Sequence, residues 1–123
     1  MRFPDDAPVT PQKREALRTK LHQLGVDLAA VDEQAIRASG PGGQKVNKTS
    51  SGVLLRLKLG AELLVVKWTR ERHHALNRFL ALRELADEVE VRVSPETSTR
   101  LLDAARRRKQ KDRRRRRTRS GGD

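Results

Sequence analysis

The chain has 123 residues, 35% apolar content and only three aromatic rings, Phe3, Trp68 and Phe79, so it can build one small core over part of its length. It has no cysteine, which excludes disulfides and thiolate metal sites. We expect no secretory signal and no membrane span, because residues 1–9 lack an apolar segment and no apolar run approaches spanning length.

The positive charge is concentrated at the C-terminal end. Residues 100–123 hold 12 Lys or Arg and 3 Asp or Glu, a net charge of +9, which leaves +3 of the total +12 for residues 1–99. Such an arm is typical of a protein that follows a phosphate backbone. A membrane surface is less favoured, because the arm lacks the Trp, Phe and Leu face of an interfacial helix.

The first half of the chain predicts a helix and a strand. Thr10 suits an N-cap, Pro11 the first helical position and Gly25 the C-terminal end, so we expect a helix over residues 11–24. The apolar residues of this segment recur at helical spacing: Ala16, Leu17, Leu21 and Leu24. After a connector, weak alternation over residues 33–38 predicts a strand.

The middle of the chain predicts a hairpin followed by a helix. Residues 52–59 alternate between apolar and polar, as in a half-buried strand, and residues 63–69 form a second apolar strand after a tight turn at residues 60–62. From His73 to about Glu88 the period becomes helical. The residues expected to pack on the sheet are Leu76, Phe79 and Leu80.

The C-terminal third is predicted from three features. Residues 89–93 alternate, which predicts a short strand or an extended exit. Ser94 and Pro95 resemble an N-cap and first helical residue, so we expect a helix from there into residues 106–111. The arginine run at residues 113–117 repels itself and is predicted to be disordered in the free protein.

Residues 37–53 read R-A-S-G-P-G-G-Q-K-V-N-K-T-S-S-G-V and predict an exposed loop. Gly40, Gly42 and Gly43 permit unusual backbone angles and close approach, Pro41 fixes one angle, and Gln44 follows at the tip. The spacing fits neither the Walker phosphate loop nor the dinucleotide fingerprint. The polar and cationic residues that follow suit a loop that enters a phosphate-lined space.

The side chains do not predict an active site complete within this chain. The serines of the loop are separated by two strands from His73 and His74, which argues against a nucleophilic triad. The two histidines are neighbours on a helix and point apart, which argues against a metal pair. The sequence therefore indicates a protein that brings one group to chemistry performed elsewhere.

The string S-G-P-G-G-Q-K-V-N-K-T-S-S-G-V, followed by E-R-x-x-x-x-N at Glu71, Arg72 and Asn77, resembles the class I peptide-chain release factors over about residues 35–85. The resemblance implies an α+β fold: a small, mostly antiparallel sheet with an exposed GGQ loop and a packed helix, plus an N-terminal helix and a basic, helical or disordered C-terminal tail. We divide the chain into an N-terminal extension (1–32), the GGQ domain (33–93) and a basic arm (94–123).

The family's loop enters the peptidyl transferase centre of the ribosome and triggers hydrolysis of the ester between peptide and tRNA. The resemblance therefore implies that Gly42, Gly43 and Gln44 are catalytic, with Gln44 orienting the water. Gln44 is also the residue that the family N-methylates. Arg72 and Asn77 could contact RNA or brace the base of the loop. The residues expected to contact RNA are Arg37, Ser39, Lys45, Asn47, Lys48, Thr49, Arg72, Arg106, Arg107, Arg108, Lys109, Lys111, Arg113, Arg114, Arg115, Arg116 and Arg117.

Only about 34 residues precede the matching region, and these are too few for a domain that reads stop codons. In this respect the chain resembles the small ribosome-rescue members of the family. One such type inserts its arm into the empty mRNA channel, as the bacterial alternative rescue factor does. The other, the mitochondrial release-factor-like type, acts on split large subunits. The tight turn at residues 60–62 leaves no room for the helical insertion of the first type and slightly favours the second type or a bacterial relative of it.

We therefore expect a codon-independent, ribosome-dependent peptidyl-tRNA hydrolase. Its expected partners are the ribosome, with large-subunit RNA, and peptidyl-tRNA. We expect a monomer with no cofactor, metal, DNA or membrane partner, in the cytoplasm or, in a eukaryote, the mitochondrial matrix. The alternative is a non-catalytic module for ribosomal RNA binding or ribosome assembly. A basic nucleoid protein would explain the tail but not the loop.

Overall fold

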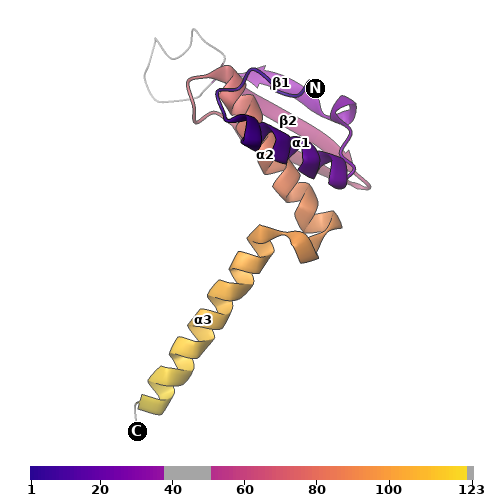
Figure 1. The fold of residues 1–123 in the computed structure, drawn as a ribbon. Helices are drawn as coiled ribbons and strands as arrows, with labels where there is room; N and C mark the ends of the chain where they lie inside the picture. Colours follow the sequence, from indigo (N-terminus) through magenta and orange to yellow (C-terminus); the bar gives the residue numbers. More distant parts are fainter. Residues whose placement is uncertain (38–50, 122–123) are drawn as a thin grey trace.

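A computed structural model describes residues 1–37 and 51–121, and for residues 117–121 it describes the backbone alone. Its helices are α1 (Pro11–Gln23), α2 (His74–Val93) and α3 (Thr99–Gly121), with two short 3-10 helices, η1 (Leu28–Ala30) and η3 (Pro95–Thr97). The strands are β1 (Asp32–Ile36), β2 (Gly52–Leu59) and β3 (Glu62–Trp68). The helices α1 and α2 lie against the sheet, and α3 projects away from this body (Figure 1). The predicted α+β fold is confirmed.

The three strands form one antiparallel sheet in the order β1-β2-β3. Leu59 pairs with Glu62, so only Gly60 and Ala61 connect β2 to β3. Gly60 has φ of +61°, which fits a type II′ hairpin with glycine at the first central position. The predicted strand at residues 52–59 has the observed bounds of β2, and the other two predicted strands are displaced by one or two residues.

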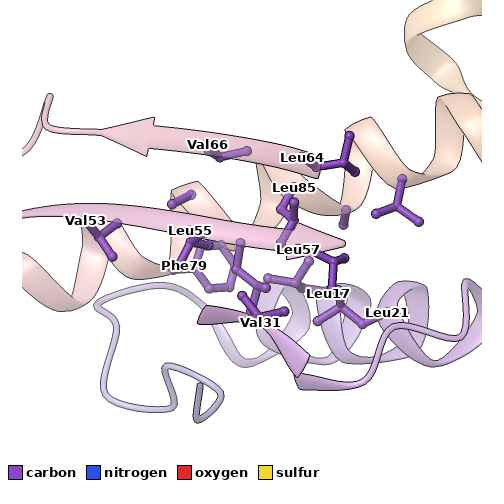
Figure 2. Packing of buried hydrophobic residues seen from close by; sticks show 14 of the residues in the cluster. Leu17, Leu21, Val31, Val53, Leu55, Leu57, Leu64, Val66, Phe79 and Leu85 are labelled. Atoms are coloured by element: carbon purple, nitrogen blue, oxygen red, sulfur yellow. The ribbon is translucent and has the colours of Figure 1, made fainter. Parts of the chain in front are cut away.

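The hydrophobic core lies between the sheet and the two helices that cover it (Figure 2). Alternate residues of β2 and β3 point inward, because side chains on a strand alternate between faces. They meet the buried side of α2 and two leucines of α1. The labelled members of this core are Leu17, Leu21, Val31, Val53, Leu55, Leu57, Leu64, Val66, Phe79 and Leu85. Full burial stabilises each such side chain by about 1.5–3 kcal/mol.

The N-terminal helix forms as predicted and shares this core. The hydroxyl of Thr10 accepts a hydrogen bond from the backbone N–H of Lys13, and Pro11 occupies the first turn. Gly25, with φ of +71°, follows the C-cap Leu24. On the surface, Lys20 forms ion pairs that join α1 to α2. The division of the chain at residues 32 and 93 stays a prediction.

The prediction of a strand or extended exit for residues 89–93 was wrong, because α2 continues to Val93. Val89 lies one helical turn after Leu85 and is 1% exposed, so the same buried face continues. Arg92 pairs with Glu88 four residues earlier, an arrangement that only a helix provides. The apparent alternation arose because valines and charged residues happen to alternate along the last turn of an amphipathic helix.

Two further predictions for the C-terminal third need correction. Ser94 and Pro95 begin only the short helix η3, and α3 starts at Thr99. The Ser98 hydroxyl accepts from the backbone N–H of Leu101, as an N-cap does, and this shifts the start of the long helix. The backbone of residues 113–117 is helical rather than disordered. Arginine has a high intrinsic helix propensity, which opposes the repulsion between its charges.

Candidate functional site

The predicted catalytic residues Gly42, Gly43 and Gln44 lie outside the described residues. The same holds for five residues predicted to contact RNA: Ser39, Lys45, Asn47, Lys48 and Thr49. The structure does describe both ends of their loop. Arg37 follows β1 directly and is exposed, and Ser51 precedes β2 directly. The base of the loop is therefore the part of this site that can be built from contacts.

The two chain ends meet in a tightly packed strand pair. Ile36 and Gly52 are partners in the ladder between β1 and β2. A Cβ atom at Gly52 would lie 2.7 Å from Cγ2 of Thr69 and 3.0 Å from the carbonyl oxygen of Ile36. Backbone from β1 and a side chain beyond β3 therefore close on this residue, and only glycine fits without displacement.

Asn77, in the first turn of α2, fastens the base of the loop. Its side chain is 0% exposed, and its Nδ2 donates to the carbonyl oxygens of Ser51 (2.6 Å) and Glu71 (2.8 Å). Its Oδ1 accepts from the backbone N–H of Glu71 at 3.0 Å. One amide thus joins the end of the loop to the segment before α2. Of the two roles open for Asn77, bracing is the one the structure supports, whereas Arg72 is exposed.

The neighbouring histidines support the same base. The ring of His73 caps α2 by accepting from the backbone N–H of Leu76 at 3.4 Å. His74 Nδ1 lies 3.1 Å from the carbonyl oxygen of Ser51. Because that oxygen only accepts, Nδ1 carries the proton in this contact. Sequence reasoning missed the contact of His74, since nothing in the spacing links residue 74 to residue 51.

The arm is joined to the body at the other end of α2. Ser98 is 1% exposed and caps α3, and the Thr97 hydroxyl donates to Glu90 at 3.0 Å. Arg100 forms ion pairs with three carboxylates of α2, those of Glu84, Asp87 and Glu88. Its Nη1 lies 2.6 Å from Glu88, and its Nη2 lies 3.0 Å from Glu84. These ion pairs connect the first turn of α3 to α2.

The electrostatics of this joint follow from its ion pairs. Hydrogen bonds from Arg92, and then from Arg100, hold the pKa of Glu88 below its ordinary value despite partial burial. Burial opposes the charge of Arg100, but its hydrogen bonds with Glu84 and Glu88 outweigh that effect and raise its pKa. Glu88 and Arg100 therefore stay ionised at neutral pH.

The predicted RNA-binding cations of the arm lie on α3. Residues 106–116 are all exposed, and the 23 residues of the helix span about 35 Å at 1.5 Å per residue. Figure 1 shows α3 leaving from the end of α2 that is remote from the loop base. The structure therefore brings Arg37, Arg72 and the loop ends together and places the arm cations far from them.

Within residues 1–37 and 51–121, no group of three or more His, Asp or Glu side chains is arranged to hold a metal ion. No helix in this part of the chain is long and apolar enough to cross a membrane.

These features define a small α+β domain that holds a Gly-Gly-Gln loop at one end and a cationic helix at the other. The RF-1 domain model matches residues 19–121. The chain therefore belongs to the RF-1 domain family, the domain of the class I release factors, as its loop string predicts.

Two curated relatives carry the same printed name, "Mitochondrial translation release factor in rescue". The human protein is 35% identical over 91 residues, which cover 73% of this chain and 53% of that protein. The Danio rerio protein is 44% identical over 69 residues, which cover 55% of this chain and 42% of that protein. The chain thus spans about half the length of the curated relatives it matches.

Proposed function

We propose that this chain is a codon-independent ribosome-rescue factor that triggers hydrolysis of the peptidyl-tRNA ester in the peptidyl transferase centre. The observation that carries the proposal is the uninterrupted string around Gly42, Gly43 and Gln44 in a member of the RF-1 domain family. The names of the two relatives support a role in translation and in rescue.

In the proposed mechanism, Gln44 positions the attacking water and its backbone N–H stabilises the developing oxyanion. A single preorganised donor of this kind contributes about 2.7–4 kcal/mol. Gly42 and Gly43 supply the backbone conformation that presents this group. The anchored loop base supports the idea, because Asn77 and the Ile36–Gly52 pair hold the described residues on either side of the loop in place. Orientation of the water and the ester supplies much of the remaining rate enhancement.

The arm is proposed to hold the factor on the ribosome. Its exposed cations suit the phosphates of ribosomal RNA, in a contact that needs no base sequence. Lys45 and Lys48 of the loop, together with Arg37 and Arg72, would contact RNA at the other end of the body. Residues 94–123 then act as the binding segment and residues 33–93 as the hydrolytic domain.

We propose a large subunit that still carries peptidyl-tRNA as the preferred substrate. The two-residue connection between β2 and β3 supports this choice, because it leaves no helical insertion at that point. If the source is a eukaryote, the names of the relatives support the mitochondrial matrix as the location.

The test is peptide release from ribosomes stalled on an mRNA without a stop codon, beside isolated large subunits carrying peptidyl-tRNA. We expect release by the unmodified protein and none by Gln44→Ala, with the large subunit as the better substrate. The matched control is Gln12→Ala, since Gln12 is an exposed glutamine on α1. Binding without release by the unmodified protein would contradict the proposal and favour the non-catalytic RNA-binding module.

A further inference from the structure

The sheet has one covered face and one uncovered face. Alternate residues of β2 and β3 point away from α2, and the pairing places them in three rungs: Leu54 with Lys67, Arg56 with Val65, and Lys58 with Leu63. Of these six residues, all but Leu54 are exposed. Leu63 and Val65 are 52% and 53% exposed, so no described part of the chain covers this side.

The uncovered face is positively charged. Lys58 and Lys67 have no hydrogen-bond or ion-pair partner among the described residues. Arg56 forms one ion pair there, in which its Nη1 lies 3.8 Å from Oδ2 of Asp32. The side of α2 that carries the arm joint is acidic, with Glu84, Asp87, Glu88 and Glu90, and its charges are engaged by neighbouring cations. Among the described residues, Lys58 and Lys67 therefore carry positive charge that no acidic neighbour offsets, whereas the charges on the arm-joint side of α2 are paired.

The three cations are spaced along the sheet and not clustered at one point. Arg56 and Lys58 lie two residues apart on one strand, about 7 Å by the rise of an antiparallel strand. Lys67 is the diagonal neighbour of Arg56 on β3, at about 7–8 Å. Each cation can thus meet a different phosphate of one strand, and the aliphatic side chains between them can contact sugar surfaces.

This charged face continues toward the base of the loop. Lys67 is one residue from the end of β3, and Arg72 follows it on the exposed segment that leads into α2. Arg37 follows β1 at the same end of the sheet. Positive charge therefore extends from the base of the loop along the outer face of the sheet to the β2–β3 hairpin.

We propose that Arg56, Lys58 and Lys67 form a third RNA-binding surface, which binds the phosphate backbone of ribosomal RNA independently of the loop and the arm. With the arm at one end and the loop at the other, this surface would determine which face of the body turns toward RNA. The proposal rests on RNA being the partner and does not depend on ester hydrolysis.

The experiment measures equilibrium binding of the full chain to vacant large ribosomal subunits as a function of salt concentration. The test variant is Lys58→Gln with Lys67→Gln. The control is Lys13→Gln with Arg83→Gln, which removes the same charge from exposed positions on α1 and α2. Binding to vacant subunits needs no hydrolysis, so a failure of the proposed enzymatic function would leave this result interpretable.

Each phosphate contact contributes about 0.7–0.9 to the slope of log K against log salt. We therefore expect the test variant, which removes two contacts, to lower the magnitude of that slope by about 1.4–1.8 and the control variant to leave it unchanged. Addition of Arg56→Gln should lower it further. Equal slopes in the test and control variants would overturn the proposal. A weaker affinity with an unchanged slope, reproduced by Leu63→Ser with Val65→Ser, would also overturn it and assign this face to a protein partner.

Discussion

The base of the loop and the base of the arm are both fastened to α2, but by different kinds of interaction. At the first turn of the helix, Asn77 is fully buried and bonds only to neutral backbone groups. At the far end, the side chain of Arg100 is 40% exposed and pairs with the carboxylates of Glu84 and Glu88. The contacts at the loop base are neutral and buried, whereas those at the arm joint are ionic and partly exposed to solvent.

The difference has energetic consequences. A buried polar group that loses its partner costs about 1–3 kcal/mol, because it cannot turn to water instead. An exposed ion pair contributes about 0.2–1 kcal/mol and is screened by salt. The loop base should therefore be rigid under all conditions in which the domain is folded. The arm joint should respond to salt and pH.

The largest effect is expected from Asn77→Ala. The substitution leaves the N–H of Glu71 and the carbonyl oxygens of Ser51 and Glu71 without this partner, so we expect a loss of about 2–4 kcal/mol in the free energy of unfolding. Urea denaturation measures it. Arg72→Ala, on an exposed neighbour, is the control and should change stability by less than about 0.5 kcal/mol. Similar losses in the free energy of unfolding for Asn77→Ala and Arg72→Ala would contradict the idea that buried hydrogen bonds stabilise the loop base.

Gly52→Ala should have the next largest effect. The new Cβ meets Thr69 and the backbone of Ile36, so we expect about 1–3 kcal/mol of destabilisation by overpacking. Thermal unfolding would measure it. The double variant with Thr69→Ser removes the nearest atom, Cγ2, and should recover part of the loss. No recovery would mean that the backbone of Ile36 is the dominant contact.

Arg100→Gln tests the ionic joint. We expect about 0.2–1 kcal/mol of destabilisation at low salt and less at high salt, because the ion pairs are partly exposed. Hydrogen exchange at the start of α3 should become faster, with no change at Ser51. Arg106→Gln, on the exposed arm, is the matched control. An effect of Arg100→Gln that does not depend on salt would show that the joint is not ionic in character.

The smallest effect concerns pH. Because Arg92 and Arg100 lower the pKa of Glu88 in the folded protein, this carboxylate stabilises the fold above its ordinary pKa of about 4.5. That contribution is lost as the pH falls below this value toward the lowered pKa. Glu88→Gln should therefore flatten the dependence of stability on pH below about 4.5. An identical pH profile in the variant would contradict the assigned pairing.

The sequence predicted the elements whose patterns are local. The cap at Thr10, the alternation over residues 52–59 and the turn at Gly60 each depend on a few neighbouring residues, and each is confirmed. The prediction of a strand or extended exit for residues 89–93 was wrong, because their alternation coincides with the last turn of a long helix. The buried face of that helix is determined by tertiary packing. The role of Asn77 was one of two alternatives, since burial cannot be seen in a motif. Contacts over long sequence separations, such as His74 with Ser51, left no signal.

We propose that the two segments have separate functions: the loop performs hydrolysis and the arm provides binding. This separation is tested most directly by the rate of peptide release from large subunits carrying peptidyl-tRNA, measured against factor concentration. The arm variant replaces six cations by glutamine, which preserves helix propensity. The replaced residues are Arg106, Arg107, Arg108, Lys109, Lys111 and Arg113.

We predict that this variant reaches the full release rate at saturation but needs at least about 100-fold more protein, since several phosphate contacts are lost. Gln44→Ala should do the reverse, with an unchanged half-saturating concentration and a rate near zero. A lowered maximal rate in the arm variant, or a Gln44→Ala protein that differs only in affinity, would contradict the account.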